Sequence, residues 1–445
     1  MQVKCHDLDK FGNGVALLPS GQKLFVEGAL PEETVEVEIT ASSQAYQRAR
    51  LKEIIHPSKY RVLPFCNFFE KCGGCTLQHL SYQGQLDYKS KMIEKLLLKE
   101  SNQETSTKIS APLTSETRGY RNRAIFRIEK SNGAIGLFEA ESNRVINIEH
   151  CPVQDEIFNE ILCLIREKIF SKITIKDDLP SFIASRSNSA GQISLAIAFQ
   201  GPNFGSTALW HILKNEPRIL SIDVYEAARG TNYLWGSFRE NIFLKEALFE
   251  RMKISIPDHP DKELTFELNA GPGFFQTNLG TSQAMLQQAM QMLKLTKNDQ
   301  VLDLFSGSAF FAIAAAQISD SVVAVEASLE AHSLAQKNIE RNKLVNIRAV
   351  NANADRPADW PDKIKEMQPS AVIIDPPRRG ISRSLMSCLK DQKPDKILTV
   401  NCKLSSFNIM QAQIREAGYQ LREVVPVDLF PHTLHIEVMA IFERL

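Results

Sequence analysis

The stretch VLDLFSGSAFF at residues 301–311 decides how the C-terminal part of this chain folds. Its apolar beginning predicts a buried strand, its small residues predict a tight turn, and the apolar run that follows predicts a helix. Strand, short turn and helix are the repeating unit of a sheet with parallel strands. The turn then places a helix N-terminus beside the end of a strand, where a ligand can bind.

The same unit recurs toward the C-terminus. Further strands are expected at VVAVEA (322–327), AVIID (371–375) and ILTVNC (397–402), and LREVVPVDLF (421–430) with HIEVMAIFE (435–443) predicts an antiparallel closing pair. We therefore expect a doubly wound, Rossmann-like α/β domain over residues 263–445. Ligands of such sheets bind beyond the carboxyl ends of the strands. The polar residues at those ends are Asp303, Glu326, Asp375 and Cys402.

The rest of the chain predicts two more domains. Residues 1–57 show short β patterns such as TVEVEIT (34–40) between turns, which suggests a small OB-like β-barrel. Residues 58–262 mix helical and strand patterns, as expected of a central α+β domain. A chain of 445 residues is long enough to bury a core in each of three domains, so we expect a multidomain α/β protein.

Composition limits the partners that the chain can have. Its net charge is zero, so no global basic field attracts nucleic acid and any such binding must be local. The N-terminal MQVKCHDLDK lacks the apolar region of a signal peptide, and FFAIAAAQI (310–318) is too short to span a bilayer. We expect a cytoplasmic protein with no membrane partner.

Three of the eight cysteines lie within the ten residues CNFFEKCGGC (66–75). In a cytoplasmic protein, clustered cysteines indicate metal binding or catalysis more than disulfides. Cys66, Cys72 and Cys75, joined by Cys151, offer four soft ligands, which suits either zinc or a closed iron-sulfur cluster. The alternative is four buried cysteines with no common role.

One turn in the C-terminal region suggests a nucleoside ligand without phosphates. The turn at 305–309 has one glycine, Gly307, where phosphate binding would favour more, and Glu326 stands where a carboxylate reaches ribose hydroxyls. An ordinary surface turn is the alternative.

A second turn bears on the atom that would be methylated. In DPPRRG (375–380), Arg378 occupies the position where amino-group methyltransferases place an aromatic residue, which argues against methylation of nitrogen. A rigid turn that merely ends the strand is the other interpretation.

Cys402 and Glu437 are candidates for chemistry at the same sheet edge. A helix N-terminus after Cys402 is expected to lower the pKa of its thiol and favour the thiolate. A thiolate that adds to carbon 6 of uracil activates carbon 5 toward a methyl donor, and a carboxylate then removes the proton from carbon 5. The alternatives are an inert buried cysteine and a solvated carboxylate. A cysteine protease would need a histidine beside the thiol, which the sequence does not place.

The stretch TSETRGYRNRAIFRIEK (114–130) is rich in arginine with interleaved aromatic residues. Arginines such as Arg121 and Arg123 can bind phosphates, while Tyr120 and Phe126 can stack on unpaired bases. An exposed edge strand with a solvated basic face explains the same pattern.

Taken together, these motifs make the chain resemble the bacterial 23S ribosomal RNA (uracil-5)-methyltransferase family nearly from end to end. The order FQTN (275–278), DPPR (375–378) and FPHT-x-H-x-E (430–437) is specific to that family. The resemblance implies an N-terminal TRAM domain that binds RNA, a central domain with a 4Fe-4S cluster, and a class I methyltransferase domain that uses S-adenosylmethionine. It also implies 23S ribosomal RNA as partner, no obligate protein partner, and a monomer.

The resemblance also carries roles over to individual residues. It makes Cys402 the nucleophile and Glu437 the general base, and it assigns Arg121 and Arg123 to RNA. The cofactor-contacting positions are Gln276, Phe305, Glu326, Asn353 and Asp375, and the cluster ligands are Cys66, Cys72, Cys75 and Cys151.

Two departures from the family pattern keep other functions open. Ala309 and Phe310 replace the second glycine and the small residue after it in the cofactor loop, and the nucleophile lies in Asn401-Cys402-Lys403 instead of Ser-Cys-Asn. A bulkier loop can weaken cofactor binding, so a noncatalytic RNA-binding module is one alternative. Against this, Lys403 is expected to favour the thiolate. A tRNA uridine methyltransferase is the other alternative, although relatives acting on tRNA often lack the barrel and the cysteines.

Overall fold

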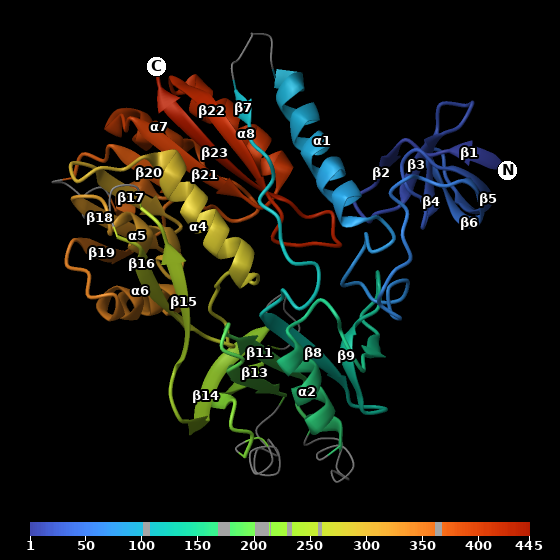
Figure 1. Cartoon of the computed structure of the whole chain (residues 1–445), viewed down its shortest axis with the longest axis horizontal. Helices are drawn as coiled ribbons and strands as arrows, with labels where there is room; N and C mark the ends of the chain where they lie inside the picture. The colour runs from blue at the N-terminus through green and yellow to red at the C-terminus, as the bar shows by residue number, and fades with distance from the viewer. Residues whose placement is uncertain are drawn as a thin grey trace.

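A computed structural model of the chain shows three regions, with the N-terminal domain projecting from the side of the other two (Figure 1). The structure describes residues 1–100, 107–167, 179–200, 213, 215–228, 234–256, 260–360 and 367–445. The chain passes from the N-terminal domain to the central region and ends in the C-terminal domain, whose edge carries the C-terminus.

The N-terminal domain is a six-stranded sheet in the order β1-β5-β6-β4-β3-β2. Although β1 and β2 stand at opposite edges, only Cys5 and His6 separate them along the chain, so the sheet must curl until its edges meet. This is the curvature of the expected barrel. Apolar side chains such as Leu24, Val26 and Val35 fill the inside. The strands are β1 (Gln2–Lys4), β2 (Asp7–Leu8), β3 (Gly14–Leu17), β4 (Lys23–Glu27), β5 (Thr34–Ser42) and β6 (Tyr46–His56).

The central region is built on a seven-stranded sheet in the order β10-β9-β8-β11-β12-β13-β14. Helix α2 (Glu156–Ile165) packs on it through an apolar face that includes Phe158 and Ile161. Asp155 caps this helix by accepting a hydrogen bond from the Ile157 amide. The strands are β8 (Arg123–Glu129), β9 (Ala134–Phe138), β10 (Val145–Asn147), β11 (Phe182–Ser187), β12 (Ile193–Phe199), β13 (Ile219–Ala227) and β14 (Trp235–Leu244).

A two-stranded hairpin and a short connector lead from the central region to the C-terminal domain. The hairpin pairs β15 (Leu248–Ile254) with β16 (Lys262–Leu268), and its apolar side joins the core of the C-terminal domain. Residues 269–278 follow, and helix α4 (Leu279–Leu293) begins at the N-cap Asn278, whose side chain accepts from the Thr281 amide. The connector therefore ends in a firmly capped helix.

The C-terminal domain contains an eight-stranded sheet in the order β19-β18-β17-β20-β21-β23-β22-β7. The neighbours β19 through β21 are parallel and β23 is antiparallel to both β21 and β22, which confirms the doubly wound pattern with an antiparallel closing pair. The strands are β7 (Lys108–Ile109), β17 (Gln300–Leu304), β18 (Ser321–Glu326), β19 (Ile347–Asn351), β20 (Ala371–Ile374), β21 (Lys396–Asn401), β22 (Tyr419–Val427) and β23 (Glu437–Arg444).

Two apolar cores lie on opposite faces of this sheet because alternate strand residues point to opposite sides. Val301 belongs to one core, while Leu302 and Leu304 belong to the other. Helices α4, α5 (Phe310–Ala315) and α6 (Leu329–Arg341) supply the first core, and α1 (Tyr82–Glu100), α7 (Arg383–Gln392) and α8 (Leu404–Glu416) supply the second. A 3-10 turn follows β19 at Pro357–Asp359.

The predicted central range, 58–262, contributes a helix and a strand to the C-terminal domain. Ile93 of helix α1 lies in the second core, and β7 pairs in parallel with β22 and forms the edge of the sheet. Figure 1 shows α1 running alongside α8 and β22, between the N-terminal domain and the sheet. Helix α1 thus joins the cysteine-rich segment before it to the C-terminal domain.

Candidate active site

Four strands of the large sheet end level with one another and so bring the predicted cofactor residues together. Leu304 lies in register with Val325 on one side and with Ile374 on the other. The next residue along each of these strands is Phe305, Glu326 and Asp375. Glu326 in turn lies opposite Asn351, two residues before Asn353. The structure therefore gathers these four predicted positions at one edge.

The turn after β17 is held in an unusual backbone conformation. Phe305, Gly307 and Ala309 have positive φ angles of 61°, 55° and 65°. The Gly307 amide donates a hydrogen bond to Glu326 Oε2 at 2.9 Å, which joins the two neighbouring strand ends. Ala309 is the N-cap of α5 and adopts the left-handed conformation that favours glycine. The departure from the family pattern at Ala309 therefore leaves the turn intact and puts strain on one residue.

Two carboxyl groups at this edge have raised pKa values. Asp303 is completely buried and accepts from the Ala312 amide at 3.1 Å, and burial with Asp375 nearby raises its pKa well above the usual value. Burial raises the pKa of Asp375 to about 7. Asn353 follows the neighbouring strand β19, and its Oδ1 accepts from the Asp355 amide at 3.0 Å. The edge is thus rich in groups that gain from a positively charged ligand.

Cys402 and Glu437 face each other across two antiparallel strands. Asn401 of β21 pairs with Val438 of β23, so the next pair in the same register is Cys402 and Glu437. Side chains directly opposite in such a pair lie on the same face within contact range. The two charges also influence each other, because Glu437 raises the pKa of the Cys402 thiol. The structure therefore brings together the predicted nucleophile and base.

The expectation that the Cys402 thiol has a lowered pKa is wrong for this structure. Cys402 does stand directly before Lys403, the N-cap of α8, as the sequence indicated. Burial, Glu437 and Asp375 nevertheless raise its pKa, and the opposing effect of Arg378 does not reverse the shift. The apolar surroundings and the two nearby carboxyl groups raise the pKa of the thiol more than the helix N-terminus lowers it. Cys402 is therefore a neutral thiol before the reaction.

Glu437 has the electrostatic environment of a base that works near neutral pH. Its side chain is buried, and burial together with Asp375 raises its pKa to about 8. A general base is most effective when its pKa lies close to the working pH. The sequence proposed Glu437 as a base from its motif, and the structure supplies the pKa that suits the role.

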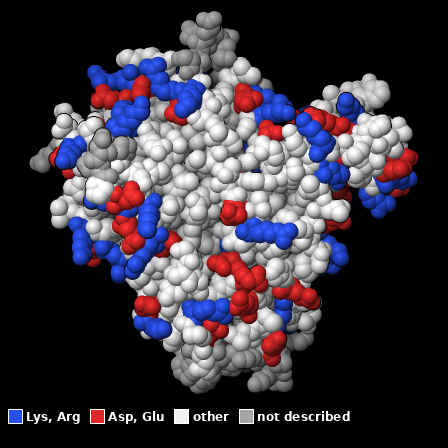
Figure 2. Space-filling model, viewed as in Figure 1, with Lys and Arg blue, Asp and Glu red and all other residues white. Residues whose placement is uncertain are grey.

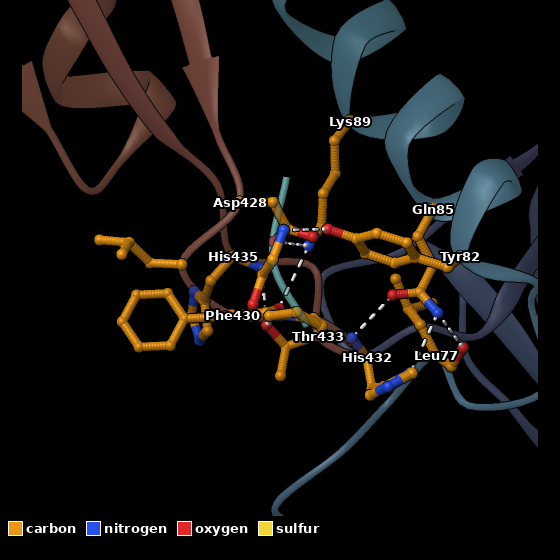
Figure 3. Close-up of polar contacts among 12 residues, drawn as sticks. Leu77, Tyr82, Gln85, Lys89, Asp428, Phe430, His432, Thr433 and His435 are labelled. Carbon is orange, nitrogen blue, oxygen red and sulfur yellow. Dashed lines mark hydrogen bonds and ion pairs between the residues drawn. The ribbon is translucent and has the colours of Figure 1, made fainter. Parts of the chain in front are cut away.

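A buried polar network holds the turn that precedes Glu437. Figure 3 shows Lys89 reaching from helix α1 to Asp428, with Nζ 2.7 Å from Asp428 Oδ1 and 3.2 Å from the Phe430 carbonyl. Both side chains of this ion pair are completely buried. Removal of either partner alone would leave an uncompensated charge, at a cost of about 3–5 kcal/mol. The ion pair therefore fixes the turn to α1.

His432 is a structural residue of the same network. Its Nε2 lies 2.9 Å from the Thr117 carbonyl and must donate there, so Nδ1 accepts from Gln85 Nε2 at 3.1 Å. The Gln85 side chain also accepts from the His432 amide at 2.7 Å (Figure 3). The Thr76 and Leu77 amides donate to the His432 carbonyl. This histidine ties the active-site turn to the cysteine-rich segment and does not act on Cys402.

Gln276 is placed by a buried arginine of the central sheet. Arg186 is completely buried, and its guanidinium donates to the carbonyls of Gln276 at 3.1 Å and Phe275 at 3.3 Å and to Asn122 Oδ1 at 3.3 Å. The connector 269–278 is thereby held on the central sheet. Gln276 itself is buried at the start of the C-terminal domain.

The four predicted metal ligands line one cavity of about 860 Å³. Cys66, Cys72 and Cys75 approach it from one loop and Cys151 from another, and the Gly74 amide donates to Cys72 Sγ at 3.4 Å. Among the described residues no group of three or more His, Cys, Asp or Glu is arranged to hold a metal ion. Four thiols around one cavity are soft ligands of the kind that zinc and iron-sulfur clusters both use, so the donor set fits either group and the metal stays a prediction.

Arg121 and Arg123 line this same cavity. The Arg123 guanidinium donates to the carbonyls of Gly271 at 2.8 Å and Gly273 at 3.2 Å, and Arg121 Nε donates to the Arg123 carbonyl at 3.2 Å. Both side chains are half-buried. Their contact with RNA stays a prediction, and the structure adds a role for Arg123 in holding the connector.

On the face shown in Figure 2, Lys and Arg side chains are interspersed with Asp and Glu, and charges of both signs lie close together. This agrees with a net charge of zero. In the part of the chain that the structure describes, no helix has the length and apolar character needed to cross a membrane.

The model of the tRNA (uracil-5-)-methyltransferase family matches residues 81–445, and that of the TRAM domain matches residues 1–52. The chain belongs to this methyltransferase family. It is thus an RNA (uracil-5-)-methyltransferase, a class that takes its methyl group from S-adenosylmethionine, and the expected multidomain fold with a TRAM domain is confirmed.

Similar proteins match almost the whole chain. A 23S rRNA (uracil(1939)-C(5))-methyltransferase of Vibrio parahaemolyticus is 28% identical over 99% of this chain and 95% of its own length. The protein of the same name from a Shewanella species is 30% identical over 98% of this chain and 94% of its own length. The crystal structure of Pyrococcus abyssi tRNA (uracil-54, C5)-methyltransferase with S-adenosyl-L-homocysteine superposes with a TM-score of 0.76 at 23% identity, covering 99% and 100% of the two chains.

Sequence reasoning missed Lys89 and Arg186 as residues that support the site. A signal for Lys89 was present, because Gln85, Lys89 and Ile93 recur every four residues on one face of α1, and a lysine on an apolar helix face needs a buried partner. Nothing in the local sequence around Arg186 marks it, since its partners come from a connector some ninety residues away.

Replacing Ala309 by glycine tests the strain in the cofactor turn. The left-handed conformation costs an L-residue about 1–2 kcal/mol, and glycine loses about 0.5–1 kcal/mol through its freer unfolded chain. We therefore expect Ala309→Gly to raise the free energy of unfolding by up to about 1 kcal/mol. Urea denaturation of the variant and the wild type measures this free energy. The control is Ala312→Gly in the adjacent helix, which should lower the free energy of unfolding. A loss of stability in Ala309→Gly would contradict the strain.

Proposed function

We propose that this protein methylates carbon 5 of a uridine in 23S ribosomal RNA through a transient bond between Cys402 and carbon 6. The observation that carries the proposal is the placement of Cys402 opposite Glu437 at the sheet edge that also holds Asp375. A thiol and a carboxyl group on the same face of two paired strands can act on the two neighbouring ring carbons of one base. The pair is complete, which favours an enzyme over a noncatalytic RNA-binding module.

Each of the two residues has a defined task. The Cys402 thiol loses its proton to solvent, Sγ bonds to carbon 6, and the electron pair of the ring double bond shifts to form an enolate with carbon 5. S-adenosylmethionine, when bound, supplies the electrophilic methyl group. The Glu437 carboxylate then removes the proton from carbon 5, the double bond reforms, and Cys402 leaves as thiolate. The uridine must be flipped out of its stack to meet both side chains.

The carboxyl-rich edge supports the assignment of the cofactor residues. S-adenosylmethionine carries a positive sulfonium and an ammonium group, and its adenosine has ribose hydroxyls that a carboxylate can accept from. Glu326 stands at the ribose position of such folds, and Asp375 lies between it and Cys402. We assign Gln276, Phe305 and Asn353 to the same cofactor on the strength of the resemblance of their motifs to those of the family.

Two sets of similar proteins bear on the substrate. Proteins named for uracil 1939 of 23S rRNA match at 28–30% identity, and a structure named for a tRNA enzyme matches at 23% identity, which supports the proposal of ribosomal RNA. The N-terminal barrel does not decide between the two RNAs. Relatives acting on tRNA were expected often to lack it, yet the Pyrococcus tRNA enzyme covers 99% of this chain.

Tritium release from carbon 5 tests the activity and the substrate together. With S-adenosylmethionine and RNA tritiated at carbon 5 of uracil, we expect the protein to release tritium from unmodified 23S rRNA and Cys402→Ala to release none. Release from tRNA alone would favour the tRNA alternative. No release from either RNA would leave the noncatalytic alternative.

A Glu437→Gln variant tests the order of the two steps. The variant can still form the bond to carbon 6 and accept the methyl group, but it cannot remove the proton from carbon 5, so the covalent protein–RNA complex should accumulate. Denaturing gel electrophoresis detects the complex. The double variant Cys402→Ala/Glu437→Gln is the control and should show none. Turnover by Glu437→Gln at the wild-type rate would exclude Glu437 as the base.

The raised pKa of Glu437 predicts an activity that increases with pH. The base acts only when ionised, and its pKa of about 8 means that the ionised fraction grows about tenfold per pH unit up to that value. The thiol, whose pKa is also raised, changes in the same direction. We expect kcat/KM to rise from pH 6 to about 8, measured at constant ionic strength. A flat profile over this range would contradict the buried environment of the base.

We further propose that the four cysteines of the central cavity hold a 4Fe-4S cluster. Protein purified without oxygen should be brown and contain about four irons per chain. Cys72→Ser should lose iron and colour, while Cys163→Ser, at an exposed cysteine outside the cavity, should keep both. Stoichiometric zinc in the wild type would replace the cluster assignment.

A further inference from the structure

The cavity that gathers the four cysteines contains positive charge without a matching carboxylate. Arg121 and Arg123 line it. Its two acidic residues already have other partners. The Arg144 Nε donates to Glu139 at 2.8 Å, and the Glu141 carboxylate lies 3.7 Å from the guanidinium of Arg48. The acidic groups of the cavity wall are therefore neutralised by arginines outside it.

A third guanidinium, that of Arg186, comes from the neighbouring strand. Arg186 of β11 is the register partner of Arg123 on β8. It is completely buried, and the partners of its guanidinium are neutral carbonyl oxygens and the Asn122 side chain. Among the described residues, no carboxylate forms an ion pair with Arg121, Arg123 or Arg186. Burial and mutual repulsion lower the pKa of Arg123 and Arg186.

Such a concentration of buried like charge is unfavourable unless an anion compensates it. The wall around it is largely apolar, including Phe68, Leu137 and Trp235, so charges interact strongly there. The protein's own candidates are the four thiols. They line the same cavity as the two arginines.

Metal binding would supply the missing negative charge. Thiols bind metals as thiolates, and four thiolates around a zinc ion or an oxidised 4Fe-4S core leave roughly two net negative charges. Two arginines in the wall match that number. The match holds whichever of the two metals is present, because it depends on the thiolates.

We propose that Arg121 and Arg123 are the counter-charge of a tetrathiolate metal centre formed by Cys66, Cys72, Cys75 and Cys151. The inference rests on the metal centre proposed above and assigns these arginines a role that their motif did not indicate. They stabilise the metal-bound, anionic state of the cavity and disfavour release of the metal. With an iron cluster they also favour the reduced form, which carries one more negative charge.

The test compares variants that remove charge with variants that keep it. Arg121→Gln removes a charge whose only described side-chain hydrogen bond is to the Arg123 carbonyl. Arg123→Lys keeps the charge and alters the contacts with Gly271 and Gly273. The matched control is Arg127→Gln, four residues after Arg123 on the same face of β8, at an arginine that lies over Phe138 and Phe182 and does not itself line the cavity.

Three quantities are measured on each anaerobically purified, full-length protein: metal content, the rate of metal loss to a chelator, and the affinity for 23S rRNA. We expect Arg121→Gln to lose metal about tenfold to a hundredfold faster than the wild type. Arg123→Lys and Arg127→Gln should stay close to the wild type. If the metal is iron, the midpoint potential of Arg121→Gln should be more negative. The affinity for RNA should be unchanged.

Other outcomes overturn the inference in distinguishable ways. Equal rates of metal loss in Arg121→Gln and Arg127→Gln, with weaker RNA binding only in Arg121→Gln, would make Arg121 an RNA contact. Fast metal loss in Arg123→Lys as well would make the hydrogen bonds, and not the charge, the important feature. A wild-type protein free of metal would remove the proposed centre itself, and the counter-charge with it.

Discussion

The alignment of strand ends in the C-terminal sheet is the constraint on which the rest of the site depends. Parallel pairing sets Phe305, Glu326 and Asp375 side by side, and the antiparallel pair β21–β23 sets Cys402 opposite Glu437. A shift of one residue in β23 would turn Glu437 to the other face of the sheet. Register is strongly specified here because both faces of the sheet carry a buried core. The two cores therefore fix the register of the strands, and the register sets Cys402 opposite Glu437.

Strand register alone does not hold the turn between β22 and β23. The protein holds it with buried polar groups, whose desolvation costs free energy. The completely buried pair Lys89–Asp428 and the His432 network link this turn to helix α1 and to the cysteine-rich segment. A buried ion pair contributes little net stability compared with an apolar replacement. What it does provide is a single arrangement, because misplacing either charge leaves it unpaired. Glu437, the proposed base, is thus positioned by residues from the other end of the chain.

The sequence predicted the elements whose causes are local. Hydrophobic periodicity located the strands 301–304, 371–374 and 397–401, and motif order located Cys402 and Glu437. It failed where the cause lies in tertiary contacts. The thiol of Cys402 was expected to have a low pKa because the helix N-terminus is visible in the sequence, whereas burial and the approach of Asp375 are not. Arg186 escaped notice for the same reason, since its partners lie on a distant connector.

The molecule gathers opposite charges at two separate sites although its net charge is zero. The sheet edge collects Asp303, Glu326 and Asp375. Burial raises the pKa of Asp303 and Asp375, and Asp375 adds to the shift of Asp303, so both carboxyl groups gain from a cation such as the sulfonium of the methyl donor. Arg121 and Arg123 line the central cavity without a carboxylate partner among the described residues, and they gain from an anion there, which the proposed metal thiolate would supply. At both sites, ligand binding would offset an electrostatic cost that folding leaves in place.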